Sequence, residues 1–420
     1  MKPSKLYYGW WITITLAVTE TVSWGIIFYA FSVFITTTEA ELGWSRAQIT
    51  GAFSLSLFMT AAGSYPVGWI LDRYGSRLLM TAGSIIATAL VFSLSKVESL
   101  TMFYIVWAVL GLTASAVLYE PSFVVVARWF TRFRPRALAL ITFAAGFAST
   151  IFLPLTDTLI REFGRQQAWI VLAVILGVIT IPLHGLILRK SPESIGLVPD
   201  GEPASSISPS ANPSTQKASS TGGMTLQEAL QDSNFWWFGL AFGLSALSAI
   251  AIRVHFIPFL IDGGYSPEFA AWVGGVIGAM QVVGRLAFAP VGERISLKSI
   301  VVGIFLLQGG AIMLLMLSPT LISIWTFVIL FGAAYGASTL VRTAMLADLY
   351  GGESYGRISA VQVTVMRTAN MLAPVGAGLI YTMNGNSYRL VLPILVGLAF
   401  LAAVAVLKVK TGPSTPQPST

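Results

Sequence analysis

The feature that most constrains this chain is a series of about a dozen long apolar stretches separated by short polar segments. A helix that crosses the hydrocarbon core of a bilayer needs roughly 20 apolar residues, which is the length of these stretches. The sequence therefore predicts an all-α polytopic membrane protein. The predicted spans cover residues 10–35, 47–71, 78–95, 102–127, 137–160, 168–188, 234–261, 269–292, 299–317, 321–347, 357–383 and 388–408.

Composition and charge placement agree with this prediction. Only 10% of the residues are charged, whereas a soluble domain usually carries about 25%. The net charge of +7 would suggest nucleic acid as a partner in a soluble protein. Here most of the basic residues lie in the segments between spans, so we expect no nucleic-acid partner. With the N-terminus in the cytoplasm, 16 of the 25 Lys and Arg residues fall in inside segments and 5 in outside segments, which predicts two cytoplasmic termini.

Several classes of chemistry are excluded by what the sequence lacks. There is no cysteine, which rules out disulfides and thiolate metal sites. The first apolar stretch is too long for a signal-peptide core, so it is interpreted as span one. The sequence shows no phosphate-binding GK[ST] loop, no zinc-type histidine spacing and no GxSxG elbow. We therefore expect no cofactor, no metal site and no enzyme activity.

A long polar segment between the sixth and seventh spans divides the chain into two halves. Its middle, GEPASSISPSANPSTQKASSTGG, has the composition of a linker. The predicted domains are a six-helix bundle at 1–190, a cytoplasmic linker with a short interfacial helix at 191–233, a second six-helix bundle at 234–408 and a disordered tail at 409–420. Transporters built from two such repeats work by rocking one bundle against the other around a midplane site.

The stretch GWILDRYGSR after span two resembles the loop 2–3 signature of the major facilitator superfamily. Gly68, Asp72, Arg73, Gly75 and Arg77 match the positions of that signature. A narrower similarity links YYGWWI, SWGIIFYAFSVF and VVGRLAFAPVGERI to the monocarboxylate transporter and oxalate/formate antiporter branch. The resemblance implies 12 transmembrane helices in two bundles. It also implies transport of small organic anions, often together with protons.

The resemblance also implies a substrate site. In that branch an arginine midway along span eight receives the substrate carboxylate, and Arg285 stands at this place. The chain departs from the animal relatives at two positions. Gln281 replaces an acidic residue one turn before the arginine, and Tyr29 lies near the position of a lysine in span one. The proton-coupling scheme of those relatives therefore does not transfer to this chain.

Ionisable side chains inside a membrane are costly, so they normally face protein or water and mark function. A guanidinium group offers a planar fork that matches a carboxylate. The predicted substrate-binding residues are Arg285, Arg253, Tyr29, Arg367 and Asn370. For Arg285 and Arg367 the alternative is a structural ion pair with a buried acid.

Four further residues are candidates for proton coupling or gating. Glu120 and Arg342 occupy nearly equivalent places in the two halves, and we hypothesise that they pair across the halves at an inner gate; a static ion pair is the alternative. Glu20 is a second candidate proton carrier, or else makes a structural hydrogen bond. His255 can titrate near neutral pH or can serve packing alone.

The sequence thus predicts a secondary active transporter of small organic anions, either proton-coupled or exchanging anions, that works by alternating access. We expect a monomer in the cell membrane (inner or plasma). Its partners would be a small carboxylate, a proton or counter-anion, and the lipid bilayer. One alternative is a proton-coupled exporter of drugs or metabolites that uses Glu20 and Glu120. Another is a non-transporting sensor on the same fold.

Overall fold

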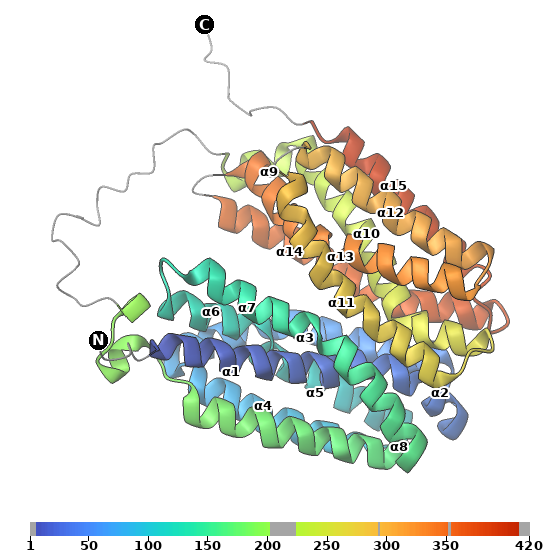
Figure 1. Ribbon diagram of the computed structural model, residues 1–420, viewed down its shortest axis with the longest axis horizontal. Coiled ribbons are helices and arrows are strands. Elements are labelled where there is room, and N and C mark those ends of the chain that lie inside the picture. Colours follow the sequence, from blue (N-terminus) through green and yellow to red (C-terminus); the bar gives the residue numbers. More distant parts are fainter. Residues whose placement is uncertain (1–5, 202–223, 293–294, 352–353, 411–420) are drawn as a thin grey trace, which may run out of the picture. The chain divides into compact units, whose positions relative to one another are not determined.

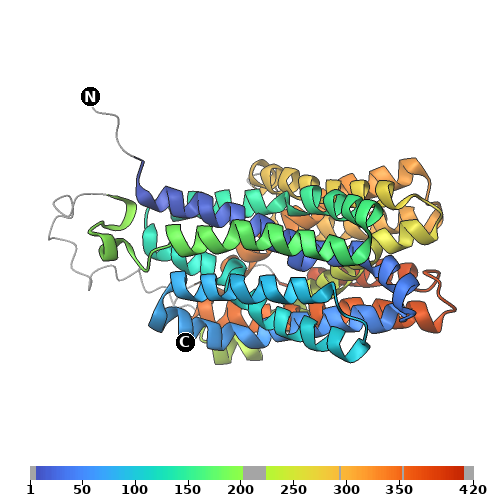
Figure 2. The ribbon, with the colours of Figure 1, turned by 90° about the horizontal axis from the view of Figure 1, so that it is seen from below.

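Every regular element in the described residues is a helix. The computed structural model describes residues 6–201, 224–292, 295–351 and 354–410. Within each compact unit, long helices lie side by side (Figures 1 and 2). Unit 1 comprises Met1–Asn212 and Leu260–Gly275, and unit 2 comprises Pro213–Phe259 and Val276–Thr420.

Unit 1 contains the helices of the first half of the chain. They are α1 (Tyr8–Ser23), the π-helical turn η1 (Trp24–Tyr29), α2 (Ala30–Leu42), α3 (Arg46–Tyr74), α4 (Ser76–Leu94), α5 (Leu100–Val117), α6 (Tyr119–Trp129), α7 (Arg134–Gly146), α8 (Ala148–Pro182), the π-helical turn η2 (Leu183–Ile187), and the 3₁₀ turns η3 (Pro192–Ile195) and η4 (Pro199–Gly201). Within this unit α3 packs against α5, α4 against α8, and α1 against α7.

Unit 2 contains most of the second half. Its helices are α9 (Leu226–Gln231), α10 (Ser233–Asp262), α11 (Pro267–Gly292), α12 (Leu297–Leu317), α13 (Leu321–Tyr350), α14 (Tyr355–Met383) and α15 (Val391–Lys408). Helix α12 packs against both α13 and α15. The end of α10 and the start of α11 belong to unit 1, because Leu260–Gly275 groups with that unit.

Helix α3 shows how the sequence sets the ends of an element. Ser45 and Gln48 form a reciprocal capping box: the Gln48 side chain accepts a hydrogen bond from the Ser45 amide at 2.9 Å. The helix ends at Gly75, whose φ of 84° lies in a region that favours glycine. The next helix starts at once with Ser76.

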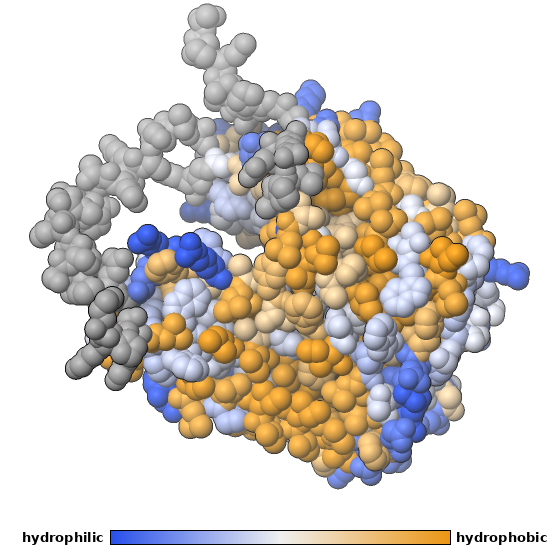
Figure 3. Space-filling view, in the orientation of Figure 1, coloured by the Kyte–Doolittle hydropathy of each residue, from blue (hydrophilic) through white to orange (hydrophobic). Residues whose placement is uncertain are grey.

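The outer surface of the helices is apolar. Ile322 is 81% exposed, Val178 68% and Leu317 68%. Hydrophobic residues cover much of the face drawn in Figure 3, and hydrophilic residues gather in separate patches. Broad exposure of large aliphatic side chains is costly in water. Lipid is therefore the solvent of this surface.

Ten helices in the described residues are long and apolar enough to cross a membrane. One of them, Arg134–Ile187, has 54 residues and contains a non-helical Gly164 (φ 79°, ψ 169°), which divides it into two helical stretches. Helix α3 has 29 residues but is less apolar than the ten. A predominantly helical protein with about ten to twelve apolar helices is therefore confirmed. The count of 12 and the cytoplasmic position of the termini stay predictions.

Span four differs from its prediction. We expected one continuous helix over 102–127, but the helix breaks at Leu118 (φ −97°, ψ −163°) between α5 and α6. Pro121 explains the break, because it has no N–H to donate to the Val117 carbonyl and its ring crowds that carbonyl. The break occurs next to the charged residue Glu120.

The predicted linker and tail are only partly described. Residues 202–223 and 411–420 lie outside the described residues. Helix α9 is found within the segment predicted to hold a short helix, and Thr225 and Glu228 cap its start. Its position at the membrane interface and the domain boundaries at 190 and 234 stay predictions.

Candidate functional site

Glu20 is a fully buried carboxyl group in unit 1. It is 0% exposed and lies on α1. Ser122 on α6, itself 0% exposed, donates a hydrogen bond to Glu20 Oε1 at 2.6 Å. Within the described part of the chain, Oε2 accepts no hydrogen bond, and Glu20 takes part in no ion pair. The sequence identified Glu20 as a candidate proton carrier but did not indicate its hydrogen-bond partner, which is Ser122.

Two irregular helix segments flank this carboxyl group. The π-helical turn η1 begins four residues after Glu20. A Cβ added to Gly25 in this turn would lie 2.1 Å from Phe152 Cδ2 and would collide with that ring. On the other side, the break at Leu118 precedes Ser122 by one helical turn. Single π-helical turns inside α-helices are frequent at functional sites. The carboxyl group therefore lies where two helices depart from regular geometry together.

Aromatic rings gather around the same segments. The ring of Trp24 lies 5.2 Å from that of Tyr119 and 5.3 Å from that of Phe28, between ring centroids. Tyr119 stacks on Phe123 at 5.1 Å, and Tyr29 contacts Phe28 at 5.4 Å. The predicted substrate residue Tyr29 is thus part of an aromatic cluster in unit 1.

In unit 2, two helices cross with their backbones in contact. A Cβ on Gly284 of α11 would lie 1.9 Å from the Ala333 carbonyl oxygen of α13, and one on Gly336 would lie 2.0 Å from the Gln281 carbonyl oxygen. Only glycine permits such an approach. Arg285 is the residue next to this crossing, so its backbone is held close to α13.

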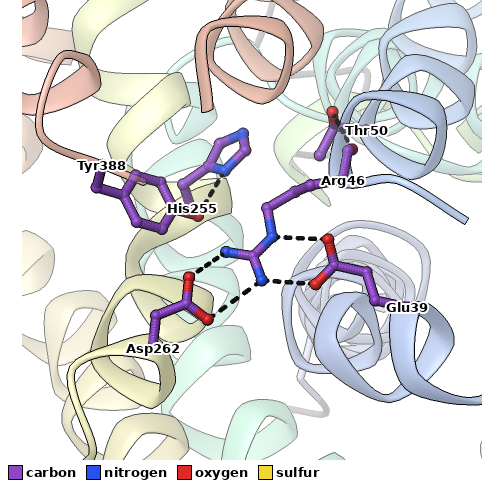
Figure 4. A network of polar contacts seen from close by, with 6 residues as sticks. All are labelled: Glu39, Arg46, Thr50, His255, Asp262 and Tyr388. Carbon is purple, nitrogen blue, oxygen red and sulfur yellow. Dashed lines mark hydrogen bonds and ion pairs between the residues drawn. The ribbon is translucent and has the colours of Figure 1, made fainter. Parts of the chain in front are cut away.

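Arg253 and His255 lie two residues apart on α10 but have different surroundings. The Arg253 guanidinium lies over the ring of Tyr335, 4.7 Å from its centroid, which is a cation–π geometry. His255 is 1% exposed, and its Nδ1 lies 2.9 Å from the Tyr388 hydroxyl (Figure 4). Its Nε2 lies 3.0 Å from the Pro374 carbonyl. This arrangement suits the packing alternative for His255. Its proton role stays a prediction.

The remaining candidates in unit 2 are half-buried. Arg285, Arg342, Arg367 and Asn370 are all intermediate between buried and exposed. Acidic residues are rare in the parts of α10 to α15 that belong to unit 2. Among the described residues there is one, the exposed Asp348 near the end of α13. The spans of unit 2 therefore hold a surplus of positive charge. The predicted pairing of Glu120 with Arg342 joins residues of different units and stays a prediction.

The loop signature forms contacts within unit 1. Asp72 accepts a hydrogen bond from Arg128 at 2.7 Å, and the Arg73 guanidinium lies 5.5 Å from the Trp69 ring centroid. The Lys190 side chain packs closely against Gly75, because a Cβ added to this glycine would lie 3.1 Å from Lys190 Cγ. The two other signature residues are Gly68 and Arg77. A Cβ added to Gly68 would meet no atom within 4 Å. The Arg77 carbonyl accepts a hydrogen bond from the Thr81 hydroxyl.

The sequence did not indicate a second charged network in unit 1. Arg46, whose side chain is 2% exposed, lies between the carboxylates of Glu39 and Asp262 (Figure 4). Its Nε donates to Glu39 at 2.9 Å and its Nη1 donates to Asp262 at 2.7 Å. The Thr150 hydroxyl also donates to the Gly275 carbonyl at 2.8 Å. These contacts bind the Leu260–Gly275 segment to the rest of unit 1. Nothing in the sequence pairs residues 216 positions apart.

Comparisons with known proteins agree with this fold. The family model described as Major Facilitator Superfamily matches residues 14–328 and, in a second match, 239–420. Monocarboxylate transporter 13 of Bos taurus is 24% identical over 389 residues, which cover 90% of this chain and 84% of that protein. The uncharacterized MFS-type transporter YcxA of Bacillus subtilis (strain 168) is 21% identical over 365 residues, 84% of this chain and 83% of that protein.

Solved structures show the same fold. The crystal structure of a bacterial homolog to the human lysosomal transporter Spinster matches with a TM-score of 0.72 at 15% identity, over 99% of this chain and 100% of that one. Similarity at this identity shows the fold alone. Together with the family match, it makes the chain a member of the Major Facilitator Superfamily, a multi-pass membrane transporter that resembles the monocarboxylate transporters.

Proposed function

We propose that this chain is a secondary active transporter of small organic anions, monocarboxylates or related carboxylates, that works by alternating access in the cell membrane. The observation that carries the proposal is the charge of the unit 2 spans. Arg253, Arg285, Arg342 and Arg367 lie within them, whereas Asp348 is exposed near a helix end. An excess of positive charge within membrane spans is costly. An anionic substrate lowers this cost whenever it binds.

Arg285 is the proposed anchor of the substrate carboxylate. The Gly284 crossing restrains its backbone, so less freedom is lost when the guanidinium engages an anion. Arg253, held over Tyr335, adds positive field, and Arg367 and Asn370 lie one turn apart on α14. The names of the monocarboxylate transporters among the relatives support this class of substrate. At 24% identity they do not fix the carbon skeleton.

The test is uptake of labelled acids into proteoliposomes that contain the purified full-length protein. The panel holds lactate, pyruvate, oxalate and benzoate, together with an uncharged sugar and an organic cation. We expect uptake of at least one carboxylate and of neither of the other two. Arg285→Gln should lose about 2–5 kcal/mol of substrate binding, a loss of roughly 30-fold or more in apparent affinity.

The matched control is Arg389→Gln, which removes an exposed arginine of unit 2 and should transport like the wild type. Arg285→Lys keeps the charge but loses the planar fork, so it should fall between the wild type and Arg285→Gln. Uptake of the organic cation alone, or unchanged carboxylate uptake in Arg285→Gln, would contradict the proposal.

A further inference from the structure

The buried carboxyl group of Glu20 is not balanced by a basic residue. Its first oxygen accepts from Ser122 at 2.6 Å, and its second oxygen has no hydrogen-bond partner among the described residues. An ionised carboxylate that is removed from water needs a cation or several donors. Asp157, the other deeply buried acid in the spans of unit 1, has such a cation: Arg161 donates to it at 2.8 Å. Glu20 has the Ser122 hydroxyl group and the nearby Trp24 indole, neither of which carries a charge.

The elements packed against α1 bring no charge to this position. Helix α1 packs against α6, α7, α8, η1, η2 and η4. The titratable groups on those elements are Tyr119, Glu120, Arg128, Arg134, Arg136, Asp157, Arg161, Glu162, Arg165, Tyr29, His184 and Asp200. Among them Arg128 pairs with Asp72, Arg165 with Glu41, and His184 with Ser84. None of the described ion pairs involves Glu20.

We propose that Glu20 is a proton-binding site, that Ser122 positions its carboxyl group, and that the proton bound there is carried in the same direction as the organic anion. The coupling rests on the function proposed above. One proton on Glu20 and one monocarboxylate on the arginines of unit 2 carry no net charge together. The neutral carboxylic acid is the form that the site as observed can hold. When water reaches the carboxyl group, it ionises and releases the proton.

The surrounding helices provide a way to expose the site. Ser122 lies on α6, which the break at Leu118 separates from α5, and Glu20 lies one turn before the π-helical turn η1. The α6 segment can therefore shift without bending a continuous helix, and η1 is an irregular turn within the helix that runs over Tyr8–Leu42. The hydroxyl of Ser122 can donate to or accept from the carboxyl group, so it serves both protonation states.

The first test is infrared difference spectroscopy of the full-length protein in lipid across a pH series, with no substrate added. At neutral pH we expect a protonated-carboxyl carbonyl band that disappears in Glu20→Gln. The matched control Asp157→Asn should keep the band, because Asp157 is paired with Arg161. If wild type and Glu20→Gln absorb identically in the protonated-carboxyl region at neutral pH, Glu20 holds no proton there and the proposal is overturned.

Ser122→Ala tests the positioning role. We expect it to shift the pH midpoint of the Glu20 band, and Ser122→Thr should restore the midpoint because it keeps the hydroxyl. A merely structural serine would lower thermal stability in Ser122→Ala without moving the midpoint. That result would remove Ser122 from the proposal and leave Glu20 as the proton site.

The coupling is tested with the labelled acid that shows uptake in the panel. Glu20→Gln mimics the neutral acid, so it should lose accumulation driven by a pH gradient and keep exchange of labelled for unlabelled acid. Gradient-driven accumulation equal to the wild type would overturn the coupling. If the wild type transports no carboxylate, the proposed function and the coupling both fail, and the infrared band alone decides whether Glu20 binds a proton.

Discussion

At the scale of single residues, three acids of unit 1 show how partners decide what a carboxyl group does. Asp200 accepts hydrogen bonds from three consecutive backbone amides, at 3.0 Å from Thr131, 2.7 Å from Arg132 and 3.3 Å from Phe133. Such a nest of amides stabilises the anion. Asp157 pairs with Arg161, whereas Glu20 accepts a hydrogen bond from the Ser122 hydroxyl and lies near the Trp24 indole. A carboxyl group thus anchors a loop in Asp200, forms an ion pair in Asp157 and is the proposed proton-binding site in Glu20.

The positions of these residues were predictable to different degrees. Glu20 stood out in the sequence because a carboxyl group within an apolar stretch is rare. Ser122 did not stand out, because serine is common in membrane helices and its contact spans 102 residues. Arg46 lies between the first two predicted spans, where an arginine is ordinary, and its carboxylate partners depend on tertiary packing. Sequence patterns locate costly residues, but only packing reveals their partners.

The phenol of Tyr7 gives a prediction about pH. Its hydroxyl lies 3.1 Å from the Trp129 carbonyl and 3.0 Å from the Val198 carbonyl. Burial, with smaller effects from Asp200 and Glu193, raises the pKa of Tyr7 from 10.0 to about 12. Below pH 10 the folded and unfolded chains both keep the proton, so the contribution of the phenol to stability is complete there. Between pH 10 and 12 the unfolded chain loses the proton first, so this contribution falls as pH rises.

We therefore expect Tyr7→Phe to be less stable than the wild type at neutral pH, and the difference to shrink as pH rises through that window. The measurement is the thermal unfolding midpoint of both proteins in detergent across a pH series. The control is Tyr74→Phe, because Tyr74 is 51% exposed. A difference that stays constant up to pH 12 would refute the role assigned to the phenolic hydrogen.

At the scale of elements, both units contain helices whose backbones touch at glycines. In unit 1 a Cβ on Gly111 of α5 would lie 2.1 Å from the Ser56 carbonyl oxygen of α3, and in unit 2 Gly284 of α11 meets Ala333 of α13 in the same way. Small residues allow close contact between membrane helices, where burial of apolar surface adds little. Close backbone contact at a glycine is thus a feature that the helix crossings of both units share.

The crossing in unit 2 can be tested with one methyl group. Gly284→Ala would place Cβ 1.9 Å from a backbone oxygen, which cannot move aside as a flexible side chain would. The helices must then separate, at a cost of about 1–3 kcal/mol, and apparent affinity for the anion should fall because Arg285 moves with α11. Thermal unfolding in detergent and uptake into proteoliposomes measure the two effects.

Gly303→Ala in α12 is the matched control, since a Cβ there meets nothing within 4 Å. Alanine favours the helix over glycine by up to about 1 kcal/mol, so this variant should be as stable as the wild type or more stable. Equal unfolding midpoints for the two alanine variants would mean that the crossing tolerates a methyl group.

Element boundaries show what the sequence could and could not predict. Apolar periodicity and length were enough to identify nearly all of the long helices, because a bilayer requires them. The break at Leu118 could have been read from the Pro121 that follows Glu120, since proline removes a helical hydrogen bond. No local sequence signal marks the π-helical turn at Trp24–Tyr29, where Gly25 packs against Phe152 of a distant helix. Its origin lies in packing.

At the scale of the whole molecule, charge divides between the two units. The spans of unit 1 enclose the carboxyl groups of Glu20 and Asp157, whereas those of unit 2 carry a surplus of arginines. This division suits a carrier that binds a proton on one half and an anion on the other. It follows from side chains within the helices of each unit, and it needs no assumption about how the units are arranged.

The segment Leu260–Gly275 is important for how the two units could move during transport. Leu260–Gly275 comprises the end of α10 and the start of α11, whose remaining lengths belong to unit 2. Within unit 1, its Asp262 and Gly275 bond to Arg46 and Thr150. Alternating access requires the two halves of the protein to move against each other. Under the alternating access proposed for this chain, we therefore expect the segment to leave its contacts in unit 1 during part of each transport cycle.

A disulfide across this contact should stop the cycle. A Cβ on Gly275 would lie 3.2 Å from Thr150 Cα, close enough for a cysteine pair, and the chain has no native cysteine to interfere. Oxidised Thr150→Cys/Gly275→Cys protein should lose uptake, and a reductant should restore it, because only the covalent bond prevents the segment from leaving. The control pair Gly63→Cys/Ser115→Cys joins α3 to α5, which stay together within unit 1, so its oxidation should leave uptake unchanged. Full uptake by the oxidised Thr150/Gly275 pair, with the disulfide verified by mass spectrometry, would mean that transport proceeds while Leu260–Gly275 stays bound to unit 1.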